Sequence, residues 1–126
     1  MKEDLSLENQ IGSIWKSIKG FHVIYFIYTG HELDLFNTII SFGDNGTNPK
    51  LLSDKKSLHL PYIEKWCNSG RSWKILDVLD NGNIILAPHM DAILTKKGDP
   101  RYLLPYIKSC VDHFGPDMKS HSHYYK

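Results

Sequence analysis

The hydrophobic residues near the start of the chain fall on one face of a helix. They recur at i, i+4, i+7, i+8 and i+11, a spacing that matches the turn of an α-helix. The stripe consists of Leu7, Ile11, Ile14, Trp15 and Ile18. Ser6 can accept a hydrogen bond from the first turn, and Gly20 is a typical helix end. We therefore predict a first helix over residues 5–19.

The next segment is apolar on two sides. Phe21, Ile24, Tyr25 and Tyr28 form one helical face, and Val23, Phe26 and Ile27 form another. Further along, a single helical stripe consists of Leu33, Phe36, Ile39 and Ile40. A helix that is apolar on two sides is buried on two sides, and a chain this short hardly covers both by itself. We therefore predict a second helix over residues 20–42 and a homodimer formed through residues 5–42.

The middle of the chain predicts two successive helices. Asn48 followed by Pro49 is a helix start, because it combines a capping side chain with a first-turn proline. Pro61 opens the next helix, which turns Trp66 toward the core and ends at a link around Gly70. Two helices joined by a short turn are typical of a helix-turn-helix.

Two short β-runs follow, over residues 75–79 and 84–86. They are joined at Asn81-Gly82, a strong hairpin signal, because a type I′ turn needs positive φ at both central residues. A helix-turn-helix followed by such a hairpin is a winged helix. The pattern places this motif at residues 48–87.

The last apolar stripe predicts a C-terminal helix over residues 99–115, capped at Asp99. Its inner side would be formed by Tyr102, Leu103, Tyr106, Ile107, Cys110, Val111 and Phe114. Pro105 lies inside this helix and predicts a kink, because proline removes a backbone hydrogen bond. Gly115 marks the end of the helix, and residues 116–126 are expected to form a loose tail.

These elements predict one domain over residues 1–115. The fold class is mainly α with a small β-hairpin: a winged helix-turn-helix with additional N- and C-terminal helices. Residues 1–42 are the dimerisation helices, 48–87 the helix-turn-helix and wing, and 99–115 the C-terminal helix. A chain of 126 residues has the size of one ordinary domain. Hydrophobic residues at 41% and charged residues at 23% exclude a disordered chain.

The charge balance does not favour nucleic acid as a partner. Lys and Arg number 15 against 14 Asp and Glu, a formal net charge of +1, whereas dedicated nucleic-acid binders carry a basic excess. The most apolar run, Phe21 to Tyr28, is far shorter than the roughly 20 residues of a membrane span. The first residues show no cationic segment followed by an apolar stretch, so we expect no secretion signal. We expect a cytoplasmic protein without a membrane partner.

Residues able to perform catalysis or bind metal are scattered. His121 and His123 are close in sequence, but zinc needs three or four converging ligands, and the chain has no HxxxH or Cys-His cluster. Cys110 and His113 would lie side by side on a helix, yet Cys110 falls on the apolar stripe. Cys67 also stands alone, so we expect both cysteines to be buried core residues. We expect no metal site and no catalytic constellation.

Four stretches, in the same order, carry a pattern shared with a known family. GHELDLFNTI at residues 30–39 is similar to a helix in which a glycine precedes LGLFDAL. PYIEKW at residues 61–66 is similar to RYVREWL, and LDVLDNGNIIL at residues 76–86 stands where the family has a wing ending in YRLTP. APHMDAILTKKGDPRYL at residues 87–103 is similar to PEHAALLTDPDSPAYL. The chain thus resembles the N-terminal winged-helix domain of class I S-adenosylmethionine-dependent methyltransferases.

The resemblance implies a small helical domain that dimerises ahead of a catalytic Rossmann domain and helps to cover the acceptor substrate. The candidate substrate-lid or interface residues are Tyr25, Tyr28, Tyr102 and Tyr106. The alternative for all four is simple packing in an interface.

The chain departs from the family in two places. NPKLLSDKKS, at residues 48–57, is a poor copy of the family's T..ELA helix. No acidic-x-Gly-x-Gly-x-Gly turn follows a strand, and this turn holds the cofactor in these enzymes. We therefore expect a non-catalytic domain without a cofactor, either a piece of a longer enzyme or a free-standing protein.

The alternative function is that of a small DNA-binding winged-helix regulator. The candidate contact residues, on or just after the helix over residues 61–72, are Lys65, Asn68, Arg71 and Lys74. Arg and Asn side chains read base edges, and lysines meet phosphates. However, Glu64 lies on the same helix and Asp80 lies at the wing tip, where each would repel the DNA backbone.

Overall fold

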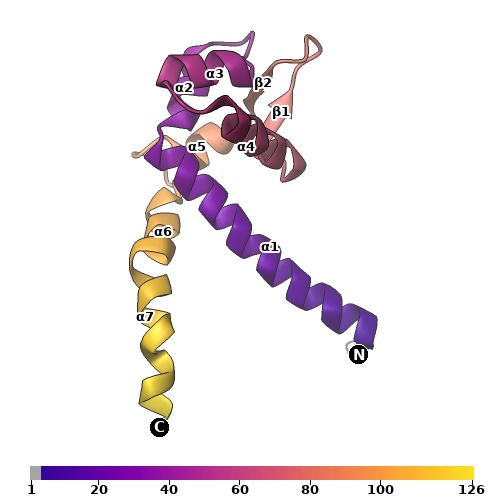
Figure 1. The fold of residues 1–126 in the computed structure, drawn as a ribbon, viewed down its shortest axis with the longest axis vertical. Helices are drawn as coiled ribbons and strands as arrows, with labels where there is room; N and C mark the ends of the chain where they lie inside the picture. Colours follow the sequence, from indigo (N-terminus) through magenta and orange to yellow (C-terminus); the bar gives the residue numbers. More distant parts are fainter. Residues whose placement is uncertain (1–3) are drawn as a thin grey trace.

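The computed structural model describes residues 4–126, which form a helical head with two helical arms (Figure 1). The head contains α2 (Leu35–Ser41), α3 (Pro49–Lys56), α4 (Leu60–Ser72), β1 (Leu76–Val78), β2 (Ile84–Leu86) and α5 (Met90–Leu94). One arm is α1 (Leu7–Glu32). The other, the C-terminal arm, consists of α6 (Leu104–Ser109), a π-helical turn (Cys110–Phe114), α7 (Gly115–Ser120) and a 3-10 turn (His121–Tyr125). The predicted class, mainly α with a small β-hairpin, is confirmed.

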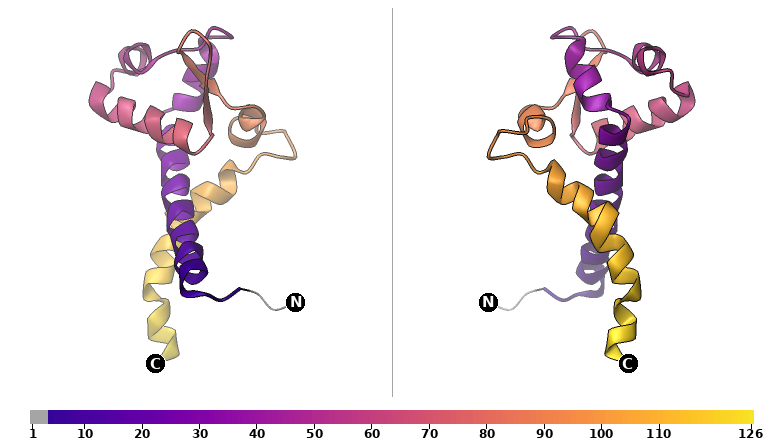
Figure 2. Two further views of the ribbon diagram at one scale, coloured as in Figure 1. Left: turned by 90° about the vertical axis from the view of Figure 1, so that its right-hand side faces the viewer. Right: turned by 90° about the vertical axis from the view of Figure 1, so that its left-hand side faces the viewer.

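The two arms leave the head in different directions. Figure 1 shows α1 and α7 diverging below the head, and Figure 2 shows from both sides that their free ends lie far from it. Near the head, α1 contacts both α6 and the π-helical turn. The molecule is therefore a small packed body with two helices that extend well beyond it.

α1 is one continuous helix of 26 residues. The Ser6 hydroxyl accepts a hydrogen bond from the Asn9 N–H at 3.2 Å, so the predicted cap is confirmed. The predicted end at Gly20 is wrong. A glycine ends a helix by adopting positive φ, and Gly20 does not do so. Glycine inside a helix costs about 1 kcal/mol relative to alanine, too little to stop a helix whose apolar pattern continues on both sides.

The chain turns at Asp34, so the predicted single helix over residues 20–42 is wrong. Asp34 has a φ of 55°, in the left-handed region that Asp tolerates better than most residues. The turn starts α2 in a new direction and buries Leu35 and Phe36 completely in the head. A straight helix would have carried these two side chains away from the core.

α3 and α4 follow each other through a left-handed turn at Ser57, which has a φ of 55°. The Asn48 side chain accepts a hydrogen bond from the Leu51 N–H at 2.9 Å, so the predicted start of α3 is confirmed. Pro61 lies in the first turn of α4, also as predicted. Proline suits this position because the first N–H groups of a helix have no partner within it.

The predicted hairpin is confirmed, with β1 and β2 antiparallel and Leu76 opposite Leu86. The predicted type I′ turn is wrong. The Gly82 N–H donates to the Leu79 carbonyl at 2.9 Å, and Gly82 has a φ of 85° whereas Asn81 does not have positive φ. This is a longer hairpin loop, in which a type I turn is followed by a glycine bulge.

A residue that precedes α3 extends the small sheet. The backbone of Thr47 exchanges two hydrogen bonds with that of Ile84, at 3.0 and 2.7 Å, on the edge of β2 away from β1. The Asn83 side chain donates a further hydrogen bond to the Asn45 carbonyl at 2.9 Å. These contacts fix the loop between α2 and α3 to the hairpin.

An aromatic cluster holds α1 against α4. The Trp66 ring stacks on Phe26 with centroids 4.5 Å apart, and the rings of Trp66 and Phe36 lie 5.5 Å apart. The predicted inward position of Trp66 is thus confirmed. Gly30 and Gly70 permit this close packing, since a Cβ there would lie 2.6 Å from Phe36 and 2.7 Å from Phe26, respectively. The link predicted around Gly70 is wrong, because this glycine lies inside α4.

The C-terminal helix begins later than predicted. The Asp99 carboxylate accepts the Arg101 N–H at 2.8 Å and pairs with the Arg101 guanidinium at 2.9 Å, forming a turn instead of a helix cap. This arginine holds the pKa of Asp99 at about 2. The helix starts at Leu104, so Pro105 occupies its first turn. The predicted kink is therefore wrong, because no intrahelical hydrogen bond is lost there.

The C-terminal helix also continues further than predicted. In the π-helical turn the Gly115 N–H donates to the Cys110 carbonyl, five residues back. Such a widened turn accommodates a following proline, here Pro116, which has no N–H of its own. The predicted end at Gly115 is wrong, and the residues expected to form a loose tail are helical as far as Tyr125.

Candidate dimerisation surface

A row of apolar residues, which we call the seam, runs along α1. It consists of Leu7, Ile11, Ile14, Ile18, Phe21, Tyr25 and Tyr28. Successive members are alternately four and three residues apart, which is the spacing of the a and d positions of a coiled coil. A repeat of this kind keeps the apolar row on one narrow side of the helix and favours winding around a partner helix.

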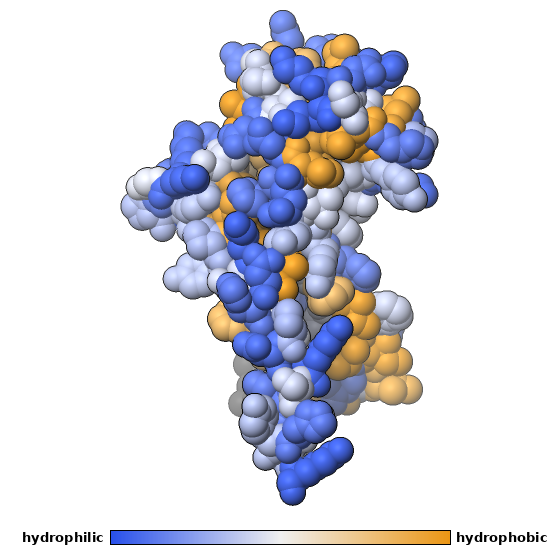
Figure 3. Space-filling model, turned by 60° about the vertical axis from the view of Figure 1, so that its left-hand side comes forward, coloured by the Kyte–Doolittle hydropathy of each residue, from blue (hydrophilic) through white to orange (hydrophobic). Residues whose placement is uncertain are grey.

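Most of the seam is exposed. Its side chains from Leu7 to Tyr25 expose between 38% and 77% of their surface, and Trp15 beside them exposes 64%. Figure 3 shows an area of apolar surface below the head, at the lower right of the view. A contiguous exposed apolar surface is a candidate interaction site.

The opposite side of α1 is small and polar. It carries Asn9, Gly12, Ser13, Lys16, Lys19 and Gly20, all exposed. The contrast between the two sides is that of a helix with one side for a partner and one for water. An ordinary surface helix lies against the body of its protein. The first half of α1, residues 7–20, is instead exposed along its whole length.

The C-terminal arm closes the seam at its head end. The Tyr28 hydroxyl donates a hydrogen bond to the Asp112 carboxylate at 2.8 Å. This hydrogen bond raises the pKa of Tyr28, because the bond needs the protonated hydroxyl. Beyond this contact the arm exposes Phe114 and Met118. The free part of the seam therefore extends from Leu7 to Tyr25.

The four tyrosines predicted as lid or interface residues have different surroundings. Tyr25 and Tyr28 are neighbours on the seam, one exposed and the other bonded to the C-terminal arm. Tyr102 is partly buried and packs against the core of the head. Tyr106, in α6, is exposed. The structure thus divides these tyrosines between the seam, the head and the start of the C-terminal arm.

The predicted DNA-contact residues lie on the outer side of the head. Lys65, Asn68 and Arg71 are exposed on α4, and Lys74 is exposed in the turn that follows, with a φ of 60°. Glu64 is exposed on the same helix. The hairpin adds two further exposed carboxylates, those of Asp77 and Asp80. The charge on this side of the head is therefore mixed.

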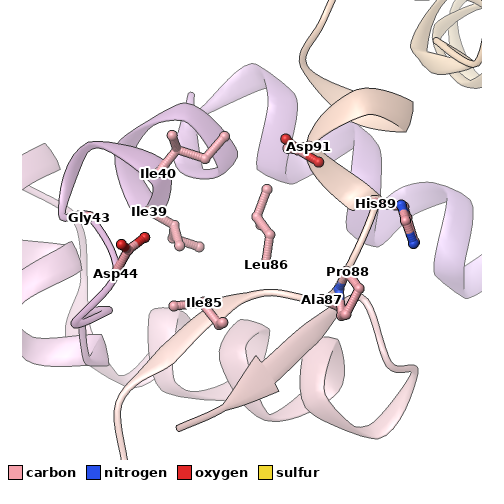
Figure 4. Close-up of a pocket in the computed structure, with 10 residues that line it drawn as sticks. All are labelled: Ile39, Ile40, Gly43, Asp44, Ile85, Leu86, Ala87, Pro88, His89 and Asp91. Atoms are coloured by element: carbon pink, nitrogen blue, oxygen red, sulfur yellow. The ribbon is translucent and has the colours of Figure 1, made fainter.

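A hollow of about 410 Å³ lies between α2, β2 and the loop before α5 (Figure 4). Three titratable side chains border it: Asp44, His89 and Asp91. Asp91 pairs with Lys96 at 2.9 Å, and this contact lowers its pKa. In Figure 4 the His89 ring points away from both carboxylates. These groups do not converge on a common point, so the hollow has no arrangement for acid–base chemistry.

The two cysteines differ in exposure. Cys67 is buried in α4, as predicted, and burial raises the pKa of its thiol to about 12. Cys110 is only half-buried, at the start of the π-helical turn, so the prediction of a buried core residue is wrong for this cysteine. The physical reason is that the C-terminal arm has already left the head at this point.

Two other features, a metal site and a membrane-spanning helix, are absent from the part of the chain that the structure describes. Within residues 4–126, no group of three or more His, Cys, Asp and Glu side chains is placed to hold a metal ion. None of the helices in that range is long and apolar enough to cross a membrane. The sheet there is a single antiparallel hairpin. It does not fit S-adenosylmethionine, which is held by a glycine turn after a strand of a parallel sheet.

No family model and no curated protein matches the chain. Two features of the structure are candidates for a functional role: the seam of α1 and the outer side of the head. The sequence prediction ends the first helix at Gly20 and therefore misses the part of the seam that follows this residue. The signal that reveals its full length is the alternation of four and three residues, which continues past Ile18 to Phe21, Tyr25 and Tyr28.

Proposed function

We propose that the chain is a non-catalytic dimerisation domain of winged-helix type, resembling the N-terminal part of a methyltransferase, and that it associates through the seam of α1. The observation that carries this proposal is the exposed apolar row from Leu7 to Tyr25 on a helix that extends beyond the head. Apolar surface gains about 25 cal/mol for each Å² removed from water. A second copy of the chain removes this row from water on both partners at once.

The order of the elements in the head supports the winged-helix assignment. α2 leads through the edge residue Thr47 into α3, which is joined to α4 by a short turn and is followed by the hairpin of β1 and β2. This order of elements is the one expected of a helix-turn-helix with a hairpin directly after its second helix. The contacts between Thr47 and Ile84 fix the hairpin beside the two helices.

The residues shared with the methyltransferase domain support a shared fold more than a shared chemistry. Leu35 and Phe36, from the first matching stretch, are buried in the core. Trp66, from the second, is at the centre of the aromatic cluster. Tyr25 lies on the seam, which favours an interface role over a substrate lid for this residue. Titration calorimetry with S-adenosylmethionine is expected to show no micromolar binding to this chain.

Dimerisation is tested by sedimentation at micromolar concentration. We expect the wild-type chain to sediment as a dimer and Ile14→Glu to sediment as a monomer near 14.5 kDa, because the variant places a charge in the middle of the seam. Ser13→Glu is the matched control, since it adds the same charge one residue away on the polar side. A wild-type chain that remains monomeric at these concentrations overturns the proposal.

DNA binding is the second candidate function, supported by one exposed helix side that carries Lys65, Asn68 and Arg71. Phosphate contacts release counterions, so such binding weakens steeply with salt. The test is a mobility shift with duplex DNA at low salt, with Arg71→Ala compared with Lys19→Ala on α1. A shift that Arg71→Ala removes and Lys19→Ala retains supports this function. No shift at low salt excludes it.

A further inference from the structure

We propose that α1 pairs with α1 of a second copy in antiparallel orientation, about a two-fold axis at the level of Lys16. This pairing rests on the proposed dimerisation and specifies how the partner lies. The free part of the seam begins at Leu7 and ends at Tyr25, and Lys16 is midway between them. An antiparallel partner centred there covers every free seam position and stops before Tyr28, where the C-terminal arm already covers the row.

The seam is self-complementary in this register. Antiparallel coiled coils place an a position opposite a d position. Leu7 then faces Tyr25 of the partner, Ile11 faces its Phe21 and Ile14 faces its Ile18. Each outer layer combines one aliphatic and one aromatic side chain, and the central layers pair Ile14 with Ile18, so no layer contains two aromatic side chains. In a parallel pair the aromatic residues would face each other at one end and Leu7 would face itself at the other, which leaves layers of unequal volume.

The position of the head also favours the antiparallel arrangement. Phe26, Ile27 and Gly30, near the end of α1, are buried against the head. A parallel pair would bring two heads and two C-terminal arms to the same end of the paired helices. The antiparallel pair places the heads at opposite ends, where neither obstructs the other.

Two residues flank the seam beside the proposed axis. Trp15 exposes 64% of its surface, and the axis brings it next to Trp15 of the partner. Paired aromatic residues at the centre of an interface are its typical source of affinity. On the other flank the axis brings the small, exposed Ser17 next to its counterpart. On each flank, therefore, the same side chain from the two copies meets across the axis: the large one on one flank and the small one on the other.

The extent of the exposed row fits a second copy as its partner. Trp15 and the free seam residues together leave on the order of 700 Å² of mainly apolar surface uncovered. A standard protein interface buries about 800 Å² on each partner. Pairing of α1 with itself therefore supplies most of such an interface without contributions from the heads.

Disulfide formation tests the orientation of the helices. In a Cys110→Ser background, Ser17→Cys is expected to form an intermolecular disulfide under mild oxidation, because the antiparallel axis places the two copies of this position together. Leu7→Cys is expected to form none, because its two copies would lie about 27 Å apart along the helices. Lys16→Cys, on the outer side at the same level, is the matched control and should not cross-link. Cys67 is buried and does not interfere.

The outcomes distinguish this inference from the proposed function. A dimer in sedimentation, with cross-linking of Ser17→Cys alone, supports antiparallel pairing. A dimer in which Leu7→Cys cross-links and Ser17→Cys does not has parallel helices, and overturns the inference while leaving the proposed function. A dimer in which no variant cross-links also overturns it. A monomer in sedimentation overturns both.

Discussion

The indole N–H of Trp66 donates a hydrogen bond of 3.1 Å to the backbone carbonyl of Phe26, while its ring stacks on the Phe26 side chain. Both contacts join α4 to α1. A carbonyl inside a helix already accepts the N–H four residues later, so the indole uses its second lone pair. This double contact fixes the angle at which α1 leaves the head, and hence the direction of the seam.

Replacing Trp66 is expected to lower the stability of the head. Trp66→Ala should reduce the free energy of unfolding by about 3–5 kcal/mol, because it removes a large buried side chain. Trp66→Phe retains an aromatic ring but loses the bond to Phe26, whose typical net contribution is about 1 kcal/mol. Urea unfolding measures both changes. Tyr62→Ala, exposed on the same helix, is the control and should change stability far less.

Glycines at two positions in α1 are expected to respond in opposite ways to alanine. Gly30→Ala should destabilise the fold by about 1–3 kcal/mol, because the new Cβ would lie 2.6 Å from Phe36 and 2.7 Å from Trp66. Gly20→Ala should stabilise it by about 0.5–1 kcal/mol, since no atom lies within 4 Å of a Cβ at that position. Thermal unfolding of both variants decides this, and equal effects would contradict it.

The contact between Tyr28 and Asp112 is expected to depend on pH in the alkaline range. The hydrogen bond raises the pKa of Tyr28 above its usual value of 10.0. The contribution of this bond is therefore fully present below that value and is lost as the pH rises through the higher pKa of the folded state. At neutral pH, Tyr28→Phe should increase hydrogen exchange in the C-terminal arm, whereas Tyr25→Phe should not. Above the raised pKa, the difference between Tyr28→Phe and wild type should disappear.

The two cysteines are expected to react with thiol reagents at very different rates. At pH 8 the buried Cys67, with a pKa of about 12, carries almost no thiolate. Cys110 is half-buried and should react first. A thiol-reagent time course should show one fast phase that Cys110→Ser abolishes, and a second phase that appears only in denaturant. Equal rates for both thiols in the native protein would contradict this expectation.

Much of the helical framework can be predicted from short-range signals. Ser6, Asn48 and Pro61 mark helix starts because a cap or a first-turn proline acts within a few residues of itself. The hairpin at Gly82 is predicted for the same reason, although its loop type is not. Sequence patterns fail where the outcome depends on distant contacts. Gly70, for example, resembles a break but serves packing against Phe26.

The candidate dimerisation surface could have been predicted more fully than the fold. The four-and-three spacing is present in the sequence, and only the expected end at Gly20 interrupts it. By contrast, the part of the seam that remains exposed depends on the turn at Asp34 and on the contact of Tyr28 with the C-terminal arm. Neither feature can be predicted from the sequence, because each depends on contacts between distant parts of the chain that form only in the complete fold.

Because α1 projects beyond the head, the helix content of its free half is expected to depend on the protein concentration. An isolated helix of roughly 15 residues is marginal in water, because its nucleation is costly and its length is short. Under the proposed pairing, the free half of α1, which also contains Gly12 and Gly20, gains its stability from the partner that covers its seam. The negative ellipticity per residue at 222 nm should therefore increase as the protein concentration is raised. Folding of this segment and association with a partner would then be one coupled process.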